Sequence, residues 1–305
     1  MDSDSGTRAA LDPFLDRSLD FGLEDSRVVV LPVPYEATTT YVRGCQHGPA
    51  ALLEASDQLE YYDVELGCEV GYAVGIHRAE PVADTRSGAI DPAAAMAEIA
   101  DRVCQLRRAG KFVIAIGGEH AITGGVVAGY RQALGDEPFT VVQIDAHGDL
   151  RDSYEGSRYN HACVMRRVLE LDVPIVPVGI RSICQEEAEL IRDRQIPTIW
   201  AHEIARDPDW IDRAIAAIPT DKVFLTIDLD GLDATVIPGV GTPQPGGLGW
   251  YETLDFVRRL FTEKTAIGMD VMELCPIAGL VYPEFTAAKL VYRAIGYQAK
   301  ARGWI

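Results

Sequence analysis

The sequence QIDAHGD at residues 143–149 constrains the fold more than any other stretch of the chain. It follows an apolar, strand-like run at residues 139–142, and it places Asp145, His147 and Asp149 at alternating positions. Because alternate side chains of an extended backbone point to the same side, these three groups are expected to converge where a strand ends. The pattern therefore predicts a buried strand that delivers oxygen and nitrogen donors to one edge of a sheet.

Two more apolar runs are followed by the same kinds of residue. Residues 223–227 lead into Asp228 and Asp230, and residues 112–116 lead through a Gly-Gly pair to His120. In open parallel sheets, ligands bind beyond the carboxyl ends of the strands, where the connecting loops meet. Burying four carboxylates and two imidazoles together without a cation would be costly, so the joint pattern predicts a site for two divalent metals.

Strand-like and helix-like segments alternate along the chain with short connections, which indicates a mainly parallel sheet covered by helices on both faces. The clearest helix is expected over residues 92–108, with Asp91 as its N-cap, and a second over residues 208–218. The length of 305 residues fits one large α/β domain. We expect a single catalytic domain over residues 27–305, preceded by an acidic and polar N-terminal arm over residues 1–26.

The composition restricts the partners and the location of the chain. A net charge of −18 disfavours nucleic acid and anionic membranes as partners, and it is compatible with a cationic substrate. No stretch approaches the run of about eighteen apolar residues that a spanning helix needs, and the N-terminus lacks the parts of a secretory signal. The six cysteines are scattered without a CxxC pair, which suits reduced thiols. We expect a cytoplasmic protein without a membrane or nucleic-acid partner.

The kinds of donor indicate the kind of metal. Carboxylates dominate, imidazoles contribute and no thiolate takes part, which suits a hard or borderline ion such as manganese better than structural zinc. Two ions about 3.5–4 Å apart could hold a bridging hydroxide that acts as a nucleophile at neutral pH. Asp149 and Asp228 are both candidates to bridge the two ions, and the sequence leaves the choice open.

Taken together, these motifs resemble those of the ureohydrolase family, which includes arginase and agmatinase, and they are most similar to the agmatinase type. The matching pieces are GGEH at 117–120, DAHGD at 145–149, VGIR at 178–181, DLD at 228–230 with GTP at 241–243, and MDVME at 269–273. The resemblance implies an arginase-like, three-layer α/β/α fold, a centre of two Mn²⁺ ions, and hydrolysis of a guanidino group to release urea. It also implies a homotrimer or homohexamer. By motif position, the metal ligands would be His120, Asp145, His147, Asp149, Asp228 and Asp230.

The resemblance also gives roles to residues outside the ligand set. His161 aligns with the family's histidine that carries a proton to the leaving amine, although a histidine at a helix start needs no such role. Glu273 would hold the planar guanidinium through paired, charge-assisted hydrogen bonds. Asp149 would help the metals to stabilise the tetrahedral intermediate. Thr242 would either donate a hydrogen bond near the reacting carbon or shape a turn.

Two positions depart from the family pattern. Glu119 stands where relatives usually carry aspartate, and Gly148 stands where threonine is common. Neither change removes a ligand, so the metal site is expected to be intact with altered local geometry.

The segment at residues 150–160 is similar to the agmatinase type and bears on the choice of substrate. Asp152 or Glu155 would meet the amine of agmatine, unless both are solvated loop charges. Arg151 and Arg158 would instead favour a carboxylate, as in guanidinobutyrate or another guanidino acid, and arginine is less expected. We expect a small cationic guanidino substrate and hydrolysis of agmatine to putrescine and urea, a step of polyamine biosynthesis.

Two other classes of function are compatible with the sequence. One is a metal-dependent deacetylase of related fold, although the paired histidines typical of that class are missing. The other is a non-catalytic sensor of guanidino ligands or polyamines, which an intact set of metal ligands disfavours.

Overall fold

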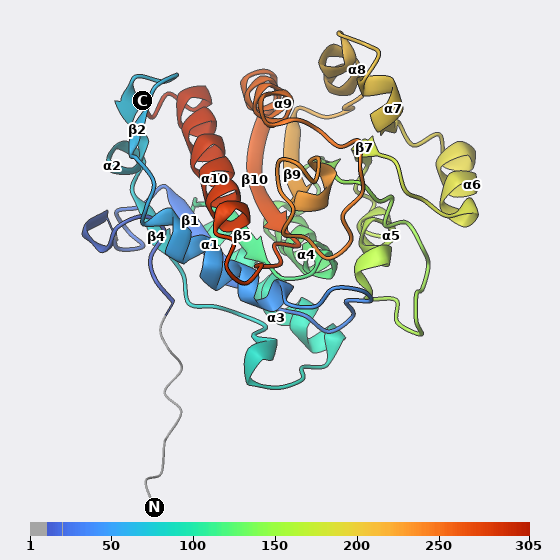
Figure 1. Ribbon diagram of the computed structural model, residues 1–305, viewed down its shortest axis with the longest axis horizontal. Coiled ribbons are helices and arrows are strands. Elements are labelled where there is room, and N and C mark those ends of the chain that lie inside the picture. The colour runs from blue at the N-terminus through green and yellow to red at the C-terminus, as the bar shows by residue number, and fades with distance from the viewer. Residues whose placement is uncertain (1–10, 20) are drawn as a thin grey trace, which may run out of the picture.

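The computed structural model describes residues 11–19 and 21–305, and within them eight parallel strands form one central sheet (Figure 1). The strand order is β4-β1-β5-β10-β9-β6-β7-β8. The strands are β1 (Val28–Val33), β4 (Ile76–Arg78), β5 (Phe112–Gly117), β6 (Thr140–Ile144), β7 (Ile175–Ile180), β8 (Ile199–Trp200), β9 (Lys222–Asp228) and β10 (Thr265–Met272). Because all neighbouring strands run in the same direction, their carboxyl ends meet at one edge.

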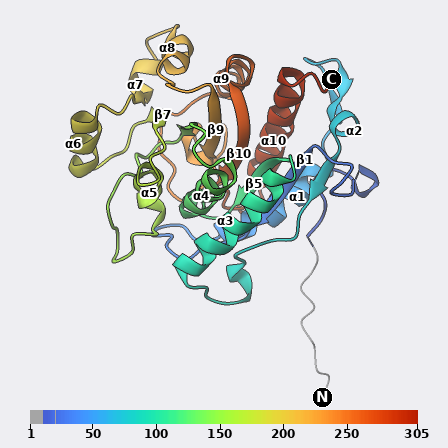
Figure 2. The ribbon, with the colours of Figure 1, turned by 180° about the vertical axis from the view of Figure 1, so that it is seen from behind.

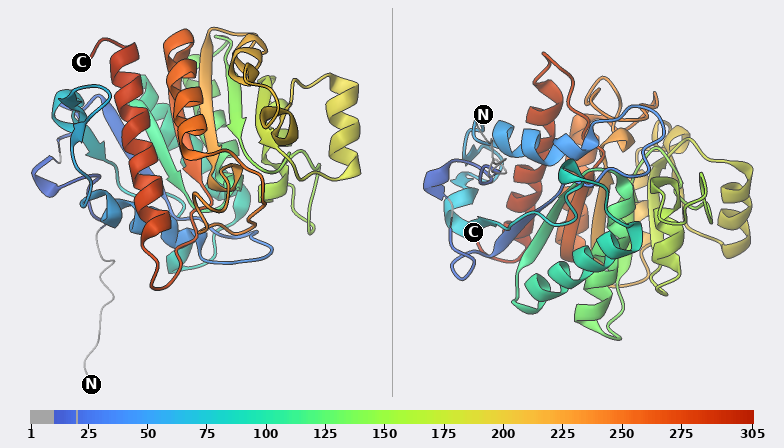
Figure 3. Two further views of the ribbon diagram at one scale, coloured as in Figure 1. Left: turned by 45° about the horizontal axis from the view of Figure 1, so that its top comes forward. Right: turned by 90° about the horizontal axis from the view of Figure 1, so that it is seen from below.

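Helices cover both faces of the sheet, as the sequence predicted for a three-layer α/β/α fold (Figure 3). One face is packed against α1 (Gly48–Ser56), α8 (Trp210–Ala216), α9 (Trp250–Glu263) and α10 (Tyr282–Ala301). The other face carries α3 (Pro92–Arg108), α4 (Thr123–Leu134) and α5 (Val164–Leu169), and α3 and α4 cross the sheet in the view from behind (Figure 2). Other elements are α2 (Val70–Val74), α6 (Gln185–Arg194), α7 (Ala201–Ile204) and a hairpin of β2 (Tyr62–Asp63) and β3 (Cys68–Glu69).

The strands are apolar on both sides because each side meets a layer of helices. In β1, Val28 and Val30 belong to one hydrophobic cluster, whereas Val29 and Leu31 belong to the other. Alternate residues of an extended strand point to opposite faces, so a strand buried on both faces has no polar alternation. This arrangement explains why the strand-like runs in the sequence are continuously hydrophobic.

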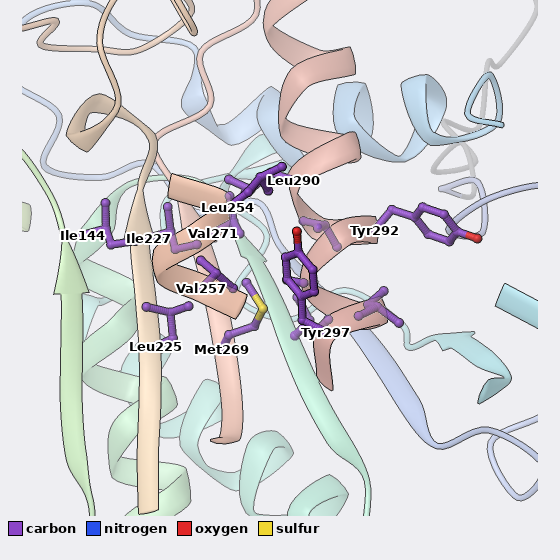
Figure 4. Packing of buried hydrophobic residues seen from close by; sticks show 14 of the residues in the cluster. Ile144, Leu225, Ile227, Leu254, Val257, Met269, Val271, Leu290, Tyr292 and Tyr297 are labelled. Atoms are coloured by element: carbon purple, nitrogen blue, oxygen red, sulfur yellow. The ribbon is translucent and has the colours of Figure 1, made fainter. Parts of the chain in front are cut away.

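The central strands pack against α9 and α10. Figure 4 shows Leu225 of β9 and Met269 of β10 near Leu254 and Val257 of α9, with Leu290 of α10 beside them. Each of these side chains is at most 5% exposed. Burying an aliphatic side chain of this size stabilises the fold by roughly 1.5–3 kcal/mol, so this cluster fixes the strands that carry the polar residues.

The helix predicted over residues 92–108 is confirmed with the same bounds. Asp91 is its N-cap, and its carboxylate accepts a hydrogen bond of 3.0 Å from the backbone N–H of Ala94. Pro92 takes the first turn, where its missing N–H costs nothing. Gly110 has a φ of +79°, a left-handed conformation that glycine tolerates and that ends the helical path.

The helix predicted over residues 208–218 is shorter in the structure. α8 begins at Trp210 and ends at Ala216, because the residues before it form a turn in which Asp207 accepts a hydrogen bond from the backbone N–H of Asp209. Trp210 is 4% exposed and packs on Phe256 of α9. The apolar stripe was therefore identified correctly, and the helix ends were not.

The described part of the predicted N-terminal arm packs on its own chain. Phe14, Leu15 and Leu19 are at most 2% exposed within the described residues, and the backbone N–H of Leu15 donates to the hydroxyl of Ser56. Residues 1–10 and 20 of that arm lie outside the described residues. Among residues 11–19 and 21–305, none of the helices has the length and apolar content needed to cross a bilayer.

Candidate metal centre

The structure brings the six predicted metal ligands together at the carboxyl edge of the central strands. His120 begins the short 3₁₀ helix after β5, and Asp228 is the last residue of β9. The Nδ1 atom of His120 lies 3.0 Å from a carboxylate oxygen of Asp145, 3.0 Å from one of Asp149 and 3.3 Å from one of Asp228. Residues from three strands that are 25 or more positions apart in the sequence therefore converge on one point.

A second group of donors lies beside the first. The Nδ1 atom of His147 is 3.0 Å from a carboxylate oxygen of Asp230 and 3.7 Å from the Oδ1 atom of Asp145. Asp145 is thus shared, because its Oδ2 atom faces His120 while its Oδ1 atom faces His147. The sequence suggested Asp149 or Asp228 as a bridge, and the geometry adds Asp145 as the residue with one oxygen directed at each group.

The residues fit a pair of divalent cations. His120 is 1% exposed, and its Nδ1 atom has no hydrogen-bond partner within the described residues, whereas its Nε2 atom lies 2.9 Å from the hydroxyl of Thr226. A histidine that donates from one ring nitrogen keeps the lone pair of the other for a metal. A buried nitrogen without a partner among three carboxylates is costly unless a cation binds there.

The raised pKa values of two carboxylates also favour a cation at this site. Burial and the charge of Asp145 raise the pKa of Asp149 to about 7, and burial together with the charges of Asp230 and Asp145 raises the pKa of Asp228 well above its usual range. Carboxylates this close repel one another when they are all ionised. Oxygen and imidazole donors without a thiolate suit hard or borderline divalent ions.

Backbone geometry aims these side chains. Asp149 has a φ of +52° and Glu273 a φ of +66°, both in the left-handed region that non-glycine residues adopt only when the surroundings enforce it. The Gly-Gly pair before Glu119 allows a close approach, because a Cβ atom on Gly118 would collide with the backbone of Tyr35. The loop after β5 can therefore lie against the loop after β1.

A cavity of about 250 Å³ opens beside the cluster. Its walls include most of the predicted site residues and several that the sequence did not single out. The predicted ones are His120, His147, Asp149, Arg151, His161, Asp228, Asp230, Thr242 and Glu273. The others are Thr39, Thr40, Tyr41, Tyr154, Ala162, Ser182, Ile183, Cys184, Glu187 and Gly241.

Glu273 faces the cavity from the end of β10. It is 8% exposed, its Oε1 atom accepts a hydrogen bond of 2.7 Å from the backbone N–H of His120, and burial raises its pKa to about 8. The arriving cation of a substrate would favour the charged carboxylate and lower that pKa. This position suits the predicted contact with a guanidinium.

Thr242 and His161 also line the cavity. The hydroxyl of Thr242 donates to Asp230 at 3.1 Å, so it holds a metal-ligand side chain. His161 begins a 3₁₀ helix capped by Asn160, and burial followed by the charges of His120 and His147 lowers its pKa to about 4. The ring is therefore neutral near pH 7 and can accept a proton before it donates one.

Of the predicted substrate contacts Asp152 and Arg151, Arg151 lines the cavity and Asp152 does not. The carboxylate of Asp152 pairs with Arg167 at 2.8 Å, its side chain is 65% exposed, and it is not part of the cavity wall. Arg151 does line the cavity, and its guanidinium stacks over the ring of Tyr154 at 4.7 Å from the centroid. Arg158 pairs with Glu170 at 2.7 Å.

Glu187 is a cavity-lining carboxylate that the sequence analysis missed. It is 4% exposed, and its two oxygens accept backbone hydrogen bonds from Leu150 at 2.9 Å and Cys184 at 2.8 Å. A glutamate three residues after a helix start is a capping signal, which is the only hint that the sequence carries. A Cβ atom on Gly148 would lie 3.2 Å from Glu187, so glycine at this position gives the carboxylate room.

A parallel α/β sheet with a carboxylate and imidazole cluster for two ions at its edge defines the class of a binuclear metal enzyme. The model of the Arginase family matches residues 26–296, so the chain belongs to the arginase family. It is a ureohydrolase of the agmatinase type, a hydrolase that acts on amidino groups, rather than a deacetylase or a sensor.

Similar proteins support this assignment. The chain is 56% identical to "N(1)-aminopropylagmatine ureohydrolase" of Synechocystis over 95% of this chain and 94% of the relative. It is 40% identical to a protein of the same name from Thermus thermophilus, over 94% of this chain and 95% of the relative. The solved agmatine ureohydrolase of Thermoplasma volcanium superimposes with a TM-score of 0.83 at 30% identity, and 97% of each chain is covered.

Proposed function

We propose that this chain hydrolyses the guanidino group of N1-aminopropylagmatine, which releases urea and leaves spermidine. The observation that carries the proposal is the 56% identity, over nearly the full length of both chains, to the Synechocystis relative of that name. Agmatine, the substrate expected from the sequence motifs, shares the guanidinobutyl part and becomes a shorter and poorer substrate. The metal pair would be two Mn²⁺ ions, since the donor set of carboxylates and imidazoles suits manganese.

In this mechanism the residues divide the work. When bound, a pair of divalent cations would supply a water of lowered pKa as the nucleophile at neutral pH. His120, Asp145, His147, Asp149, Asp228 and Asp230 would hold the two ions. Glu273 would orient the guanidinium carbon toward the cluster, and Asp149 would support the tetrahedral stage. His161 would take a proton as the C–O bond forms and pass it to the amine nitrogen as the C–N bond breaks.

The cationic tail of the substrate fits the outer cavity. Beyond the metal ligands and Glu273, Glu187 is the carboxylate in the described cavity wall, and each of its oxygens keeps one lone pair free for an ammonium group. The ring of Tyr41, which is 75% exposed at the rim, offers a face to a second cation. Arg151, which also lines the cavity, is the feature that would favour a guanidino acid instead.

A urea-release assay distinguishes these substrates. The purified, manganese-loaded protein would be given N1-aminopropylagmatine, agmatine, guanidinobutyrate and arginine under identical conditions. A charge-assisted hydrogen bond to the extra amine contributes about 1.5–3 kcal/mol, so kcat/KM should be about ten-fold or more higher for aminopropylagmatine than for agmatine. Equal or higher kcat/KM with agmatine would overturn the proposal, and preference for guanidinobutyrate would point to Arg151.

We also infer that the protein works in the cytoplasm, as the composition suggested, and that it forms a homotrimer or homohexamer, as the resemblance implied. Light scattering coupled to size exclusion would measure the oligomer, and a monomer at micromolar concentration would contradict it.

A further inference from the structure

Glu119 is a buried carboxylate to which the proposed mechanism gives no part. It is 0% exposed and stands directly before His120. Its Oε2 atom accepts hydrogen bonds from the backbone N–H groups of Ala37 at 3.1 Å and Thr38 at 2.7 Å, and from the hydroxyl of Thr39 at 3.1 Å. Its Oε1 atom accepts the hydroxyl hydrogen of Thr38 at 2.8 Å. One carboxylate therefore fixes the whole turn at residues 37–39.

The hydroxyl of Thr38 connects this turn to His161. It accepts a hydrogen bond from the backbone N–H of His161 at 3.1 Å, and it lies 3.4 Å from the Nδ1 atom of the same residue. The backbone carbonyl of Thr38 accepts a further bond from the side-chain amide of Asn160 at 3.4 Å. The loop after β1 and the 3₁₀ helix that carries His161 are thus joined through a single threonine.

The donors and acceptors around Thr38 determine which ring nitrogen of His161 carries the hydrogen. The four donors directed at Glu119 favour its ionised form, which can only accept. A hydroxyl has one hydrogen, so the hydrogen of Thr38 belongs to Glu119. Toward His161, Thr38 can offer only a lone pair, and the Nδ1 atom must then be the donor. A neutral imidazole with hydrogen on Nδ1 has an unprotonated Nε2 atom, which is the ring nitrogen left for the cavity that His161 lines.

We propose that Glu119 and Thr38 are positioning residues that hold neutral His161 in the Nδ1–H tautomer and so present its unprotonated Nε2 atom to the reacting group. The inference rests on the role given to His161 in the proposed function. Glutamate has one more carbon than aspartate, which adds about 1.5 Å of reach. That reach lets the carboxylate contact the turn and its threonine together.

The test compares four substitutions, two of them at Thr38. Thr38→Val removes the hydroxyl, and Thr38→Ser keeps it. Thr39→Val is the matched control, because Thr39 also donates to Glu119 but has no described contact with His161. Glu119→Gln tests the carboxylate itself, and the threonine pair decides the matter if that variant does not fold.

The first readout is the tautomer of His161 in protein loaded with diamagnetic Mg²⁺ and labelled with ¹⁵N-histidine. The chain has only six histidines, so the resonance of His161 is identified by its loss in His161→Asn. The wild type, Thr38→Ser and Thr39→Val should show the hydrogen on Nδ1, whereas Thr38→Val should show it partly or wholly on Nε2. A wild-type ring with its hydrogen on Nε2 would overturn the proposal.

The second readout is the split between kcat and KM in the manganese-loaded enzyme. Misplaced general acid–base groups typically lose about 10²- to 10⁴-fold in rate, so Thr38→Val should lower kcat by about 10²-fold with little change in KM, and Thr38→Ser should restore it. An unchanged kcat in Thr38→Val would also overturn the inference. The tautomer readout needs no substrate, so failure of the substrate proposal would leave it interpretable.

Discussion

At the scale of single residues, the site depends on where each oxygen and nitrogen atom points. Asp145 directs one oxygen at His120 and the other at His147, while Asp149 adopts a left-handed backbone to face His120. Thr242 lies on the wall of the same cavity yet gives its hydroxyl hydrogen to Asp230. Residue types alone do not decide such assignments, because a carboxylate or hydroxyl has several partners within reach.

Substituting Asp149 by asparagine should remove metal and activity together. The amide keeps the size of the carboxylate but loses the charge that a divalent ion needs, so metal affinity should fall by about 100-fold or more. Calorimetry with Mn²⁺ and urea release would measure both. His161→Ala is the contrasting variant: it should keep two ions per chain and lose about 10²- to 10⁴-fold in kcat. Normal urea release by either variant would show that its role is wrong.

Substituting Gly148 by threonine, the residue that the resemblance leads one to expect there, should weaken binding of amine substrates. A Cβ atom would lie 3.0 Å from Ile183 and 3.2 Å from Glu187, so the Glu187 carboxylate should shift by a few tenths of an ångström and lose its alignment with the amine. Loss of one charge-assisted hydrogen bond predicts about a ten-fold or larger rise in KM for N1-aminopropylagmatine. Butylguanidine, which has no amine tail, is the matched control substrate. An equal rise in KM for both compounds would contradict a role of Glu187 in holding the tail.

At the scale of secondary-structure elements, an ion pair holds the C-terminal helix against the small hairpin. Arg293 of α10 donates at 2.8 Å to each carboxylate oxygen of Asp63 in β2, and both side chains are at most 8% exposed. Asp63 also accepts the backbone N–H groups of Glu65 and Leu66. The same helix covers β10, so this pair supports the layer behind the site.

Arg293→Leu should therefore destabilise the protein strongly. Removing one partner leaves a buried carboxylate without its counter-ion, which typically costs about 3–5 kcal/mol of the free energy of unfolding. Chemical denaturation followed by circular dichroism would measure the loss. A double variant that also carries Asp63→Asn should lose less than the sum of the two single changes. Strict additivity would mean that the pair is not coupled.

At the scale of the whole molecule, the metal cluster links stability to pH. Without metal, the pKa of Asp149 is raised to about 7, that of Glu273 to about 8 and that of His147 to about 12. Each of these folded-state pKa values lies above its unfolded value, whereas the lowered pKa of His161 acts in the opposite direction below about pH 6.5. The groups with raised pKa values outnumber it, so the folded protein binds more protons than the unfolded chain between about pH 5 and 8. Stability of the metal-free protein must then fall as pH rises.

Chelation should make this dependence visible. In EDTA the melting temperature should decrease from about pH 5 to pH 8. Each such group lowers the free energy of unfolding by at most roughly 1.4 kcal/mol per pH unit. Mn²⁺ should raise the melting temperature most at the upper end of this range, because bound cations replace the missing protons. A melting temperature that is independent of pH without metal would contradict the repulsive cluster.

Much of the fold and of the metal site could be predicted from the sequence alone. The apolar runs, the alternating donors after them and the cap at Asp91 follow from the periodicity of the backbone, which is a local property. They were enough to predict the parallel three-layer sheet and to choose the side chains that converge at its edge. The start of α8 was missed because the turn at Asp207 competes with the helix, and local patterns do not show which of the two forms.

Which groups meet across the molecule was decided only by the tertiary structure. Asp152 and Glu187 are both acidic, but the structure places them differently. Arg167 pairs with Asp152 outside the cavity, whereas two backbone N–H groups hold Glu187 in the cavity wall. Likewise, Glu119 reaches residues about eighty positions earlier in the chain. Local spacing fixes the direction in which a side chain leaves the backbone, whereas its partner depends on strand order and crossover paths that bring distant segments into contact.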